Sequence, residues 1–209
     1  MFKGCTKLTH TPEKLLPATN LKEFCYRYMF QDCTSLVNAP ELPATEMADN
    51  CYYAMFYGCT NLTQVQEKLP ATTLAKNCYQ QMFFGCTSLA KAPELPATTP
   101  AIGSYEGMFS GCTSLTESPK LQIKASSNAV VINGGVYKEM FKGCSALKKV
   151  TFLITGTELD VTLPSAVMTD WLSGVAATGT FYKSSNIKTY ATGASGIPNG
   201  WTVADCTGN

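Results

Sequence analysis

A five-residue motif, Met-Phe-x-Gly-Cys or a near copy of it, recurs along most of this chain and constrains its fold more than any other feature. The copies begin at Met1, Met29, Met55, Met82, Met108 and Met140, at intervals of 28, 26, 27, 26 and 32 residues. Self-similarity at a period of this length is typical of a solenoid, in which each unit buries its apolar face only against its neighbours. The sequence therefore predicts one elongated stack of repeats with a continuous core.

A single unit, residues 36–59, predicts one short strand followed by one helix, and hence an α/β solenoid with parallel strands. Pro40 lacks a backbone donor, so the extended segment 36–42 must be very short or end there. Thr45 is a candidate helix N-cap, and Gly58 occupies the place of a left-handed C-cap. Between them the apolar residues follow helical spacing, at i, i+1, i+4, i+5 and i+8: Cys51, Tyr52, Met55, Phe56 and Cys59.

The regular part of the chain predicts a solenoid over residues 1–150, and the remainder predicts a capping region over 151–209. The first repeat lacks its Cys-Tyr half, so we expect a truncated unit within a longer protein. Residues 129–135 resemble an inserted strand with a turn. In the last part of the chain we expect strands at 148–155 and 179–182 and a short helix at 164–175. These elements would close the end of the solenoid.

Composition excludes several classes of function. The 209 residues carry a formal net charge of +1, so no electrostatic footprint for nucleic acid is present. No apolar run of about 18 residues occurs, so we expect no membrane insertion of this segment. No signal peptide is visible at the start of the sequence.

Nine of the ten cysteines fall into two columns of the repeat, and Cys206 stands apart. Ser104 and Val136 continue the first column, which indicates that a small buried side chain suffices there. Helices stacked about 8–10 Å apart would keep cysteine copies too far apart for disulfides. We therefore expect mostly buried free thiols, with some disulfides as the alternative. No Cys-x-x-Cys spacing supports a metal site, and no cofactor is indicated.

No constellation of catalytic residues is apparent, so we expect a protein that is not an enzyme. The chain has one histidine, His10, which would have to serve any Ser-His-Asp arrangement from within the truncated first unit. No phosphate-binding loop or dinucleotide fingerprint is present. The carboxylates are scattered, and nothing in the sequence selects a pair for glycoside hydrolysis.

The units Met-Phe-x-Gly-Cys-Thr-Ser-Leu-x-x-Ala-Pro-Glu-Leu-Pro-Ala-Thr, at 29–45 and 82–98, resemble the BspA-like leucine-rich repeats of Bacteroides-type bacteria. The closing stretch from Gly179 to Trp201 also resembles the usual end of such domains. The resemblance implies a leucine-rich-repeat solenoid in an exported cell-surface protein that binds or adheres. It carries no catalytic residues over to this chain.

Two surfaces are candidates for binding a protein or glycoprotein partner. Tyr53, Tyr57 and Phe84 occupy outward slots of adjacent units, out of phase with the apolar stripe, where other units carry polar residues. The second surface is a polar strip beside the strands, which leucine-rich solenoids typically use for binding: His10, Asn38, Gln64, Lys91, Glu117 and Lys149. We therefore expect a non-enzymatic adhesion scaffold at the bacterial surface. The alternative is a passive spacer module, and exposed aromatics can also simply cover their own repeats.

Overall fold

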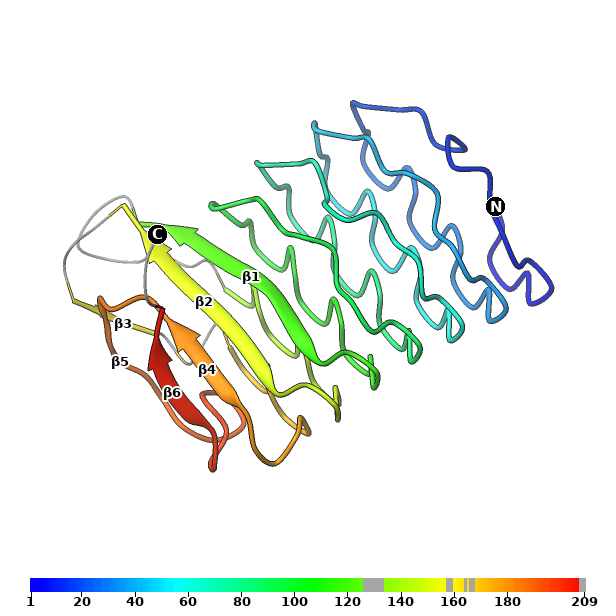
Figure 1. Ribbon diagram of the computed structural model, residues 1–209. Helices are drawn as coiled ribbons and strands as arrows, with labels where there is room; N and C mark the ends of the chain where they lie inside the picture. The colour runs from blue at the N-terminus through cyan, green and yellow to red at the C-terminus, as the bar shows by residue number, and fades with distance from the viewer. Residues whose placement is uncertain (126–133, 157–159, 164, 166–167, 207–209) are drawn as a thin grey trace.

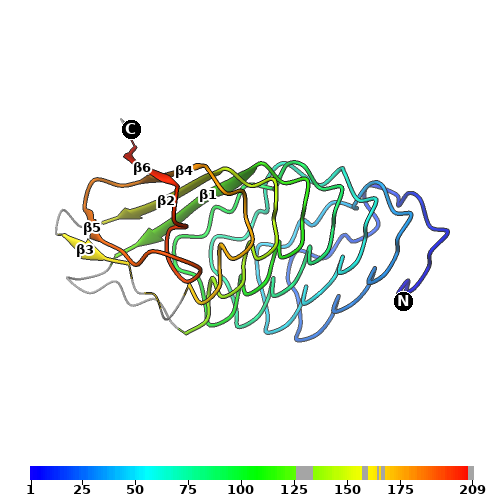
Figure 2. The ribbon, with the colours of Figure 1, turned by 90° about the horizontal axis from the view of Figure 1, so that it is seen from below.

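The computed structural model describes residues 1–125, 134–156, 160–163, 165 and 168–206 of the chain. It shows an elongated stack of coils, with the N-terminus at one end and the labelled strands at the other (Figure 1). Seen from below, the strands of the larger sheet lie along one side of the stack in its C-terminal part, in line with extended segments of the earlier repeats (Figure 2). The predicted solenoid is confirmed. The expected strand at 129–135 lies mostly outside the described residues.

Parallel strands line one side of the stack in its C-terminal part, as the sequence predicts. A four-stranded sheet has the order β1-β2-β4-β6, and all its pairs are parallel. Its strands are β1 Glu117–Lys124, β2 Lys149–Thr155, β4 Thr180–Lys183 and β6 Thr202–Asp205. A smaller parallel pair joins β3 Val161–Thr162 to β5 Ile187–Thr189. The strands expected near 148–155 and 179–182 are therefore present as β2 and β4.

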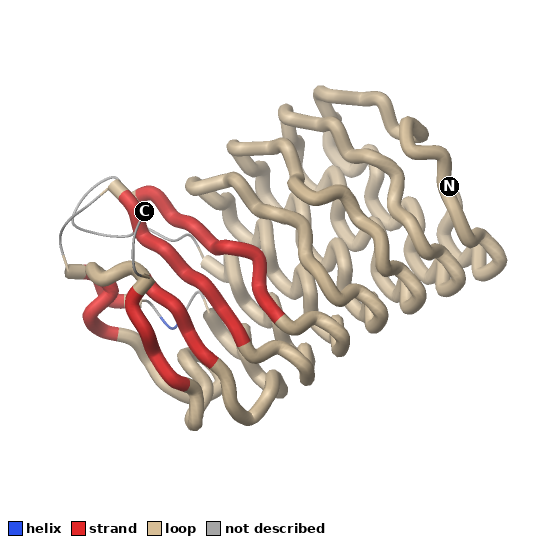
Figure 3. Tube along the Cα trace, viewed as in Figure 1, coloured by secondary structure: helices blue, strands red, loops and turns tan. Residues whose placement is uncertain are grey.

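The earlier repeats have no continuous strand on this side and are drawn as loops (Figure 3). Their extended segments are joined by isolated parallel bridges such as Asn38 with Gln64 and Lys68 with Glu94. The physical reason is proline, which donates no ladder hydrogen bond. Four successive units carry Leu-Pro-Ala-Thr, whereas the fifth has Leu-Gln-Ile-Lys at 121–124 and there forms β1.

The prediction of one helix in each unit is wrong. The described residues contain no α-helix, and each predicted helix is a run of consecutive turns. We call these stacked segments the turn ladder: residues 24–33, 50–59, 77–86, 103–112 and 135–144. The segment expected as a helix at 164–175 also contains such turns, at 169–174, although Pro164 and residues 166–167 lie outside the described chain.

Main-chain hydrogen bonds of two alternating kinds build the turn ladder. One set closes turns within a unit, as when the Arg27 N–H donates to the Phe24 carbonyl at 3.3 Å. The other set joins units, as when the Tyr28 N–H donates to the Tyr53 carbonyl at 3.0 Å and the Phe30 N–H to the Met55 carbonyl at 2.9 Å. Repeats therefore stack at hydrogen-bonding distance, closer than packed helices would.

Every fourth residue of the turn ladder has a positive φ. In the third unit these residues are Asn50 (56°), Ala54 (50°) and Gly58 (71°), and the next unit has Asn77, Gln81 and Gly85. Glycine and asparagine adopt this conformation at the least steric cost. The ladder thus repeats every four residues, and over nine residues that period gives the same apolar spacing as a 3.6-residue helix.

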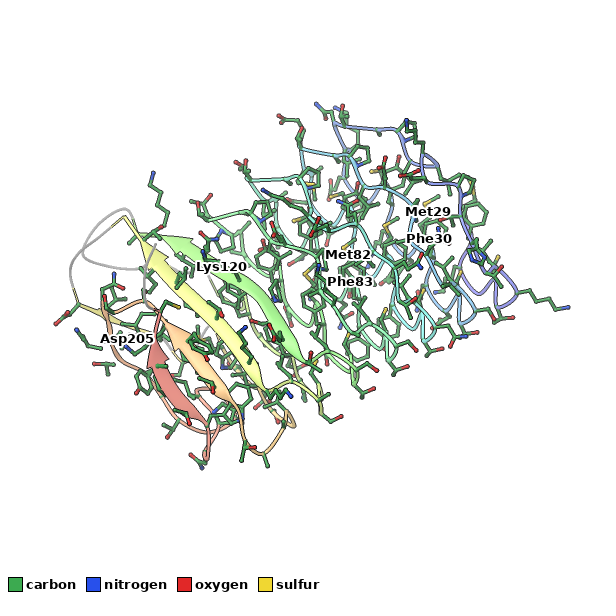
Figure 4. All side chains as sticks on the ribbon, in the orientation of Figure 1. Met29, Phe30, Met82, Phe83, Lys120 and Asp205 are labelled. Atoms are coloured by element: carbon green, nitrogen blue, oxygen red, sulfur yellow. The ribbon has the colours of Figure 1, made fainter. Side chains whose placement is uncertain are left out.

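The core lies between the two sides of the stack and is built from columns of identical side chains. Met29, Phe30, Met82 and Phe83 point into this interior (Figure 4). Phenylalanine rings stack on their copies with centroids 5.3–5.7 Å apart, in the series Phe2, Phe30, Phe56, Phe83, Phe109 and Phe141. A tyrosine column runs beside it at 5.7–6.2 Å, through Tyr26, Tyr52, Tyr79, Tyr105 and Tyr137. The predicted core columns are confirmed.

In the C-terminal part, the core contains two tryptophans, Trp171 and Trp201. Trp171 is fully buried and packs edge-to-face against Phe152 and Phe181, at 6.2 and 6.0 Å. Its indole N–H donates to the Gly196 carbonyl, and that of Trp201 donates to the Ala176 carbonyl, both at 2.8 Å. Each large ring therefore has its one polar group satisfied, as buried tryptophan requires.

Candidate binding surfaces

The strand-side strip lies on the surface, but its members differ in how free they are. His10, Gln64, Lys91 and Glu117 are exposed, whereas Asn38 is half-buried. The Asn38 amide nitrogen donates to the Thr11 carbonyl at 3.2 Å, and its oxygen accepts from the Thr11 N–H at 3.4 Å. Asn38 therefore ties two repeats together, which sequence reasoning did not anticipate.

Charged residues of the strip form ion pairs with neighbours. Lys149 Nζ lies 3.0 Å from Glu117 Oε2, and Lys91 Nζ lies 3.6 Å from Glu67 Oε1. Both pairs are largely exposed, so each contributes little to stability. These four side chains remain accessible to a partner that offers matching charges.

A groove of about 830 Å³ crosses the strip next to β1. Residues of 90–96 line one wall, residues of 116–122 line the other, and Lys68 lies at one end. Lys91 and Glu117 of the predicted strip lie on opposite walls. The volume falls within the range of about 300–1,000 Å³ that ligand sites occupy in proteins. We call this hollow the β1 groove.

The β1 groove exists because the main-chain ladder between two repeats is interrupted. Hydrogen bonds close it at both ends, from the Ser114 N–H to the Thr87 carbonyl at 3.2 Å and from the Lys124 N–H to the Thr98 carbonyl at 2.8 Å. Between these bonds, all residues are described and no backbone hydrogen bond joins the two walls. Prolines on both walls remove donors: Pro93, Pro96 and Pro119.

Apart from Lys91 and Glu117, sequence reasoning missed the residues that line the groove. Leu95 and Pro119 are buried, while Lys120 is exposed on β1 (Figure 4). The available signal was the change from Leu-Pro-Ala-Thr to Leu-Gln-Ile-Lys at 121–124, where the strand chemistry changes between adjacent units. A smaller hollow of about 270 Å³ adjoins the groove and contains Gln64 and Lys91.

The three predicted aromatic residues divide into two groups. Tyr57 and Phe84 stack on each other, with centroids 4.6 Å apart and ring planes 2° from parallel. Tyr53 instead packs edge-to-face on Tyr28 at 5.3 Å, and its hydroxyl donates to Gln81 Oε1 at 3.3 Å. All three predicted residues are half-buried, on the turn-ladder side of the stack.

Arg27 completes the second aromatic group, and the sequence analysis did not identify it. Its guanidinium lies 4.7 Å from the ring centroids of both Tyr28 and Tyr53 and 5.4 Å from that of Phe24. It also donates to the Tyr28 hydroxyl at 3.0 Å. Because Arg27 occupies the same slot as Tyr53 one unit earlier, cation–π contact between adjacent units is the expected result.

All ten cysteines are free thiols, and seven of them are buried. Five of the buried thiols hydrogen-bond to a phenylalanine carbonyl of the preceding unit at 3.0–3.2 Å: Cys33, Cys59, Cys86, Cys112 and Cys144. Burial raises the pKa of Cys51 to about 11 and the pKa of Cys59 to about 12. The expectation of buried thiols agrees with the structure, although its argument from helix spacing was wrong.

The described residues contain no candidate metal site. No group of three His, Cys, Asp or Glu side chains there is placed to hold a metal ion. His10 is exposed, and it forms no ion pair with any described residue. Nor does any described helix have the length and apolar character needed to cross a membrane.

Comparison with protein families identifies the repeat. The family model for the BspA type leucine rich repeat region matches residues 1–116 and 25–161, with six copies. These matches cover well over half of the chain and all of the turn-ladder units. No curated protein and no solved structure matches the chain.

Proposed function

Since the chain belongs to the BspA-type leucine-rich repeat family, we propose that it is a non-enzymatic binding scaffold of a bacterial cell surface, and that a protein or glycoprotein partner lies across its strand side. Repeat scaffolds of this kind generally mediate protein interactions and present one continuous surface that several units share. The proposal includes adhesion to host material and an origin in Bacteroides-type bacteria, in keeping with the family resemblance.

One observation carries this proposal: three residues of the variable polar strip line two neighbouring hollows of the strand side. Gln64 and Lys91 line the smaller hollow, and Lys91 and Glu117 line the β1 groove. On the opposite side, main-chain N–H and C=O groups of each unit are hydrogen-bonded to one another within the turn ladder. The strand side is therefore where a partner finds both concavity and unshared polar groups.

The aromatic column is a second proposed contact within the same function. Tyr57 and Phe84 form a stacked, half-exposed pair, while the same slot carries Gln31 and Ser110 in flanking units. The scaffold does not require aromatic rings there, so the pair supplies apolar area for a partner. Asn38 remains part of the proposed strip through its position, although its amide is occupied by Thr11.

The test is a triple substitution of the strip, Gln64→Ala, Lys91→Ala and Glu117→Ala. Binding to immobilised mucin and fibronectin should weaken about tenfold or more, because central interface contacts carry about 1–2 kcal/mol each. The matched control removes the same residue types from the turn-ladder side, by Gln80→Ala, Lys142→Ala and Glu139→Ala, and should leave binding unchanged.

The same assay decides between the two surfaces and the spacer alternative. If Tyr57→Ser with Phe84→Ser weakens binding and the strip variant does not, the aromatic pair is the contact surface. If neither the intact chain nor any variant binds the two glycoproteins, the passive spacer becomes the better description. Thermal melting of each variant verifies that the changes act on the surface and not on the fold.

A further inference from the structure

We propose that the β1 groove binds an extended polypeptide segment, whose main chain completes the interrupted ladder by hydrogen bonding to Lys120 and Gln122. This inference rests on the proposed binding function and specifies the chemistry of the partner. It assigns the recognition to the main chain of β1, and not only to the variable side chains of the strip.

The first step concerns the direction of the free groups. In a strand, the N–H and C=O groups of successive residues point to opposite edges. The Ala125 N–H donates to the Thr155 carbonyl of β2, whereas the Lys124 N–H donates to Thr98 on the opposite edge. By this alternation, the N–H and C=O groups of Lys120 and Gln122 point away from β2 and into the β1 groove.

The second step compares this interface with its neighbours. In two other units, the residue that corresponds to Lys120 donates its N–H to the preceding unit. The Glu94 N–H donates to the Glu67 carbonyl at 2.7 Å, and the Glu41 N–H donates to the Glu13 carbonyl at 2.8 Å. In the described chain, the Lys120 N–H makes no such bond. Its counterpart acceptor would be the carbonyl of Pro93, across the groove.

The opposite wall also offers main-chain groups. The Leu69 N–H bonds forward to the Glu94 carbonyl at 3.1 Å, and the Leu42 N–H bonds forward to the Gln66 side chain at 2.6 Å. Leu95 occupies the same slot, and no hydrogen bond of its N–H is found within the described residues. At the interface of Leu42 and Gln66, the Gln66 side chain accepts the hydrogen bond that a main-chain carbonyl accepts elsewhere. No described side chain accepts a hydrogen bond from the Leu95 N–H at the β1 groove.

The third step concerns the occupant. Two facing rows of unpaired main-chain groups are the template that an added strand uses in β-augmentation. The wall formed by residues 117–122 is about 20 Å long at ~3.3 Å per residue, which accommodates about six extended residues. None of the lining residues is aromatic, so the groove lacks the flat ring on which a sugar would stack.

Charge indicates one preference of the peptide. Lys68 and Lys120 line the groove, are exposed and have no ion-pair partner among the described residues, whereas Glu94 is the one lining carboxylate of that kind. The other charged lining residues, Lys91 and Glu117, are already paired. An acidic side chain of the bound peptide would therefore lie beside Lys120. The preferred occupant is an extended segment of about six residues that carries one carboxylate.

Gln122 provides the decisive variant, because the four preceding units have proline in its slot. Gln122→Pro removes one N–H from the groove at a position where Pro96 and its earlier copies are tolerated. Gln122→Ala is the matched control, since it keeps the N–H and removes the side chain. The probe is a library of random linear heptapeptides displayed on phage, selected on the intact 209-residue chain.

We expect enriched peptides with a shared acidic position. As synthetic peptides, they should bind Gln122→Pro about tenfold more weakly or worse, and Gln122→Ala within about twofold of the original chain. N-methylation of a central peptide amide should weaken binding to a similar extent. Hydrogen exchange of the unmodified chain needs no variant, and it should show the Lys120 and Gln122 amides protected when peptide is added.

Three results would overturn the proposal: no enrichment over selection on Gln122→Pro, equal affinity for both variants, or protection confined to other amides. Binding of mucin glycans in the groove without any peptide binding would also overturn it and identify a glycan site. If peptides fail while glycoprotein binding still depends on the strip, the inference fails and the proposed function stands. If neither is bound, both fail.

Discussion

The two sides of the solenoid solve the same problem of joining one repeat to the next in different ways. On the turn-ladder side, every described interface between units is closed by forward N–H···O=C bonds, whatever the outer side chains are. On the strand side, the connection differs from one interface to the next. Some units are joined by isolated bridges, one interface uses the Gln66 side chain, and the C-terminal units form a continuous sheet. The difference teaches that one side fixes the stack, which leaves the other side free to vary.

High pH should lower the free energy of unfolding through the buried thiols of the turn-ladder side. Burial holds the pKa of the column thiols above the ordinary value, with Cys59 and Cys144 at about 12. The folded state therefore binds the thiol proton more tightly than the unfolded state. Stability is complete below the unfolded pKa of about 8.5 and is lost as the pH rises toward 12, by about 1.4 kcal/mol per pH unit for each such thiol.

The urea midpoint, measured at a pH of about 8, 9 and 10, should fall steeply over the last interval. A midpoint that stays constant across this range would show that the thiols are accessible in the folded state. Native alkylation gives the complementary measurement, because Cys5 and Cys25 are exposed and should react well before the seven buried thiols.

Adjacent phenylalanines on the turn-ladder side should differ strongly in their contribution. Phe83 is buried and stacks between Phe56 and Phe109, so Phe83→Ala should cost about 3–5 kcal/mol of unfolding free energy. Phe84, one residue later, is half-buried, and Phe84→Ala should cost about 1 kcal/mol through its stack on Tyr57. Equal losses in chemical denaturation would mean that the inward and outward slots are misassigned.

Proline substitutions sharpen the comparison on the strand side. Leu153 of β2 is the partner of Gln122 in register, and β2 is paired on both edges. Leu153→Pro removes a bonded N–H and should cost about 2–3 kcal/mol. Gln122→Pro removes an N–H that faces the open groove and should cost less than about 1 kcal/mol. Thermal melting of the pair tests this, and a reversed order would place the interruption elsewhere.

The smallest expected effect concerns the positive-φ positions. Gly85 has a φ of 71°, and an added Cβ would meet nothing closer than 3.8 Å. Gly85→Ala should therefore cost only the strain of the left-handed conformation, about 1–2 kcal/mol, and Gly85→Asn less. Denaturation curves of both variants measure the difference. A neutral alanine would contradict the left-handed conformation of this position.

Much of the architecture is readable from the sequence, because side-chain columns repeat whatever backbone carries them. The repeat, the buried Met-Phe pairs, the parallel strands and the family follow from the motif alone. The helix does not, because a four-residue and a 3.6-residue period agree over nine residues. The distinguishing signal was the recurrence of glycine and asparagine in one phase of a four-residue period, at Asn77, Gly85, Gly103, Gly107 and Gly111. The signal is incomplete, because other residues such as Ala54 and Gln81 also occupy these slots.

The candidate site was only partly predictable. Five of the six strip residues are exposed, since polar slots beside a strand point outward, whereas Asn38 is half-buried. The β1 groove was not foreseen, because it depends on hydrogen bonds that two neighbouring units fail to make. Such an absence is a property of a pair of units, here residues 88–98 and 114–124, and no single repeat contains it.

The forward bonds of the turn ladder also give the solenoid a direction. At each interface, the earlier unit supplies the N–H donors and the later unit supplies the carbonyl acceptors, as in Tyr28 to Tyr53 and Phe83 to Met108. The two faces of a unit are thus chemically unlike, in contrast to a strand edge, which offers donors and acceptors together. Two donor faces, or two acceptor faces, could not hydrogen-bond to each other through this ladder. Units can therefore be joined through the turn ladder only head-to-tail, because the direction of the peptide N–H and C=O groups is the same in every unit.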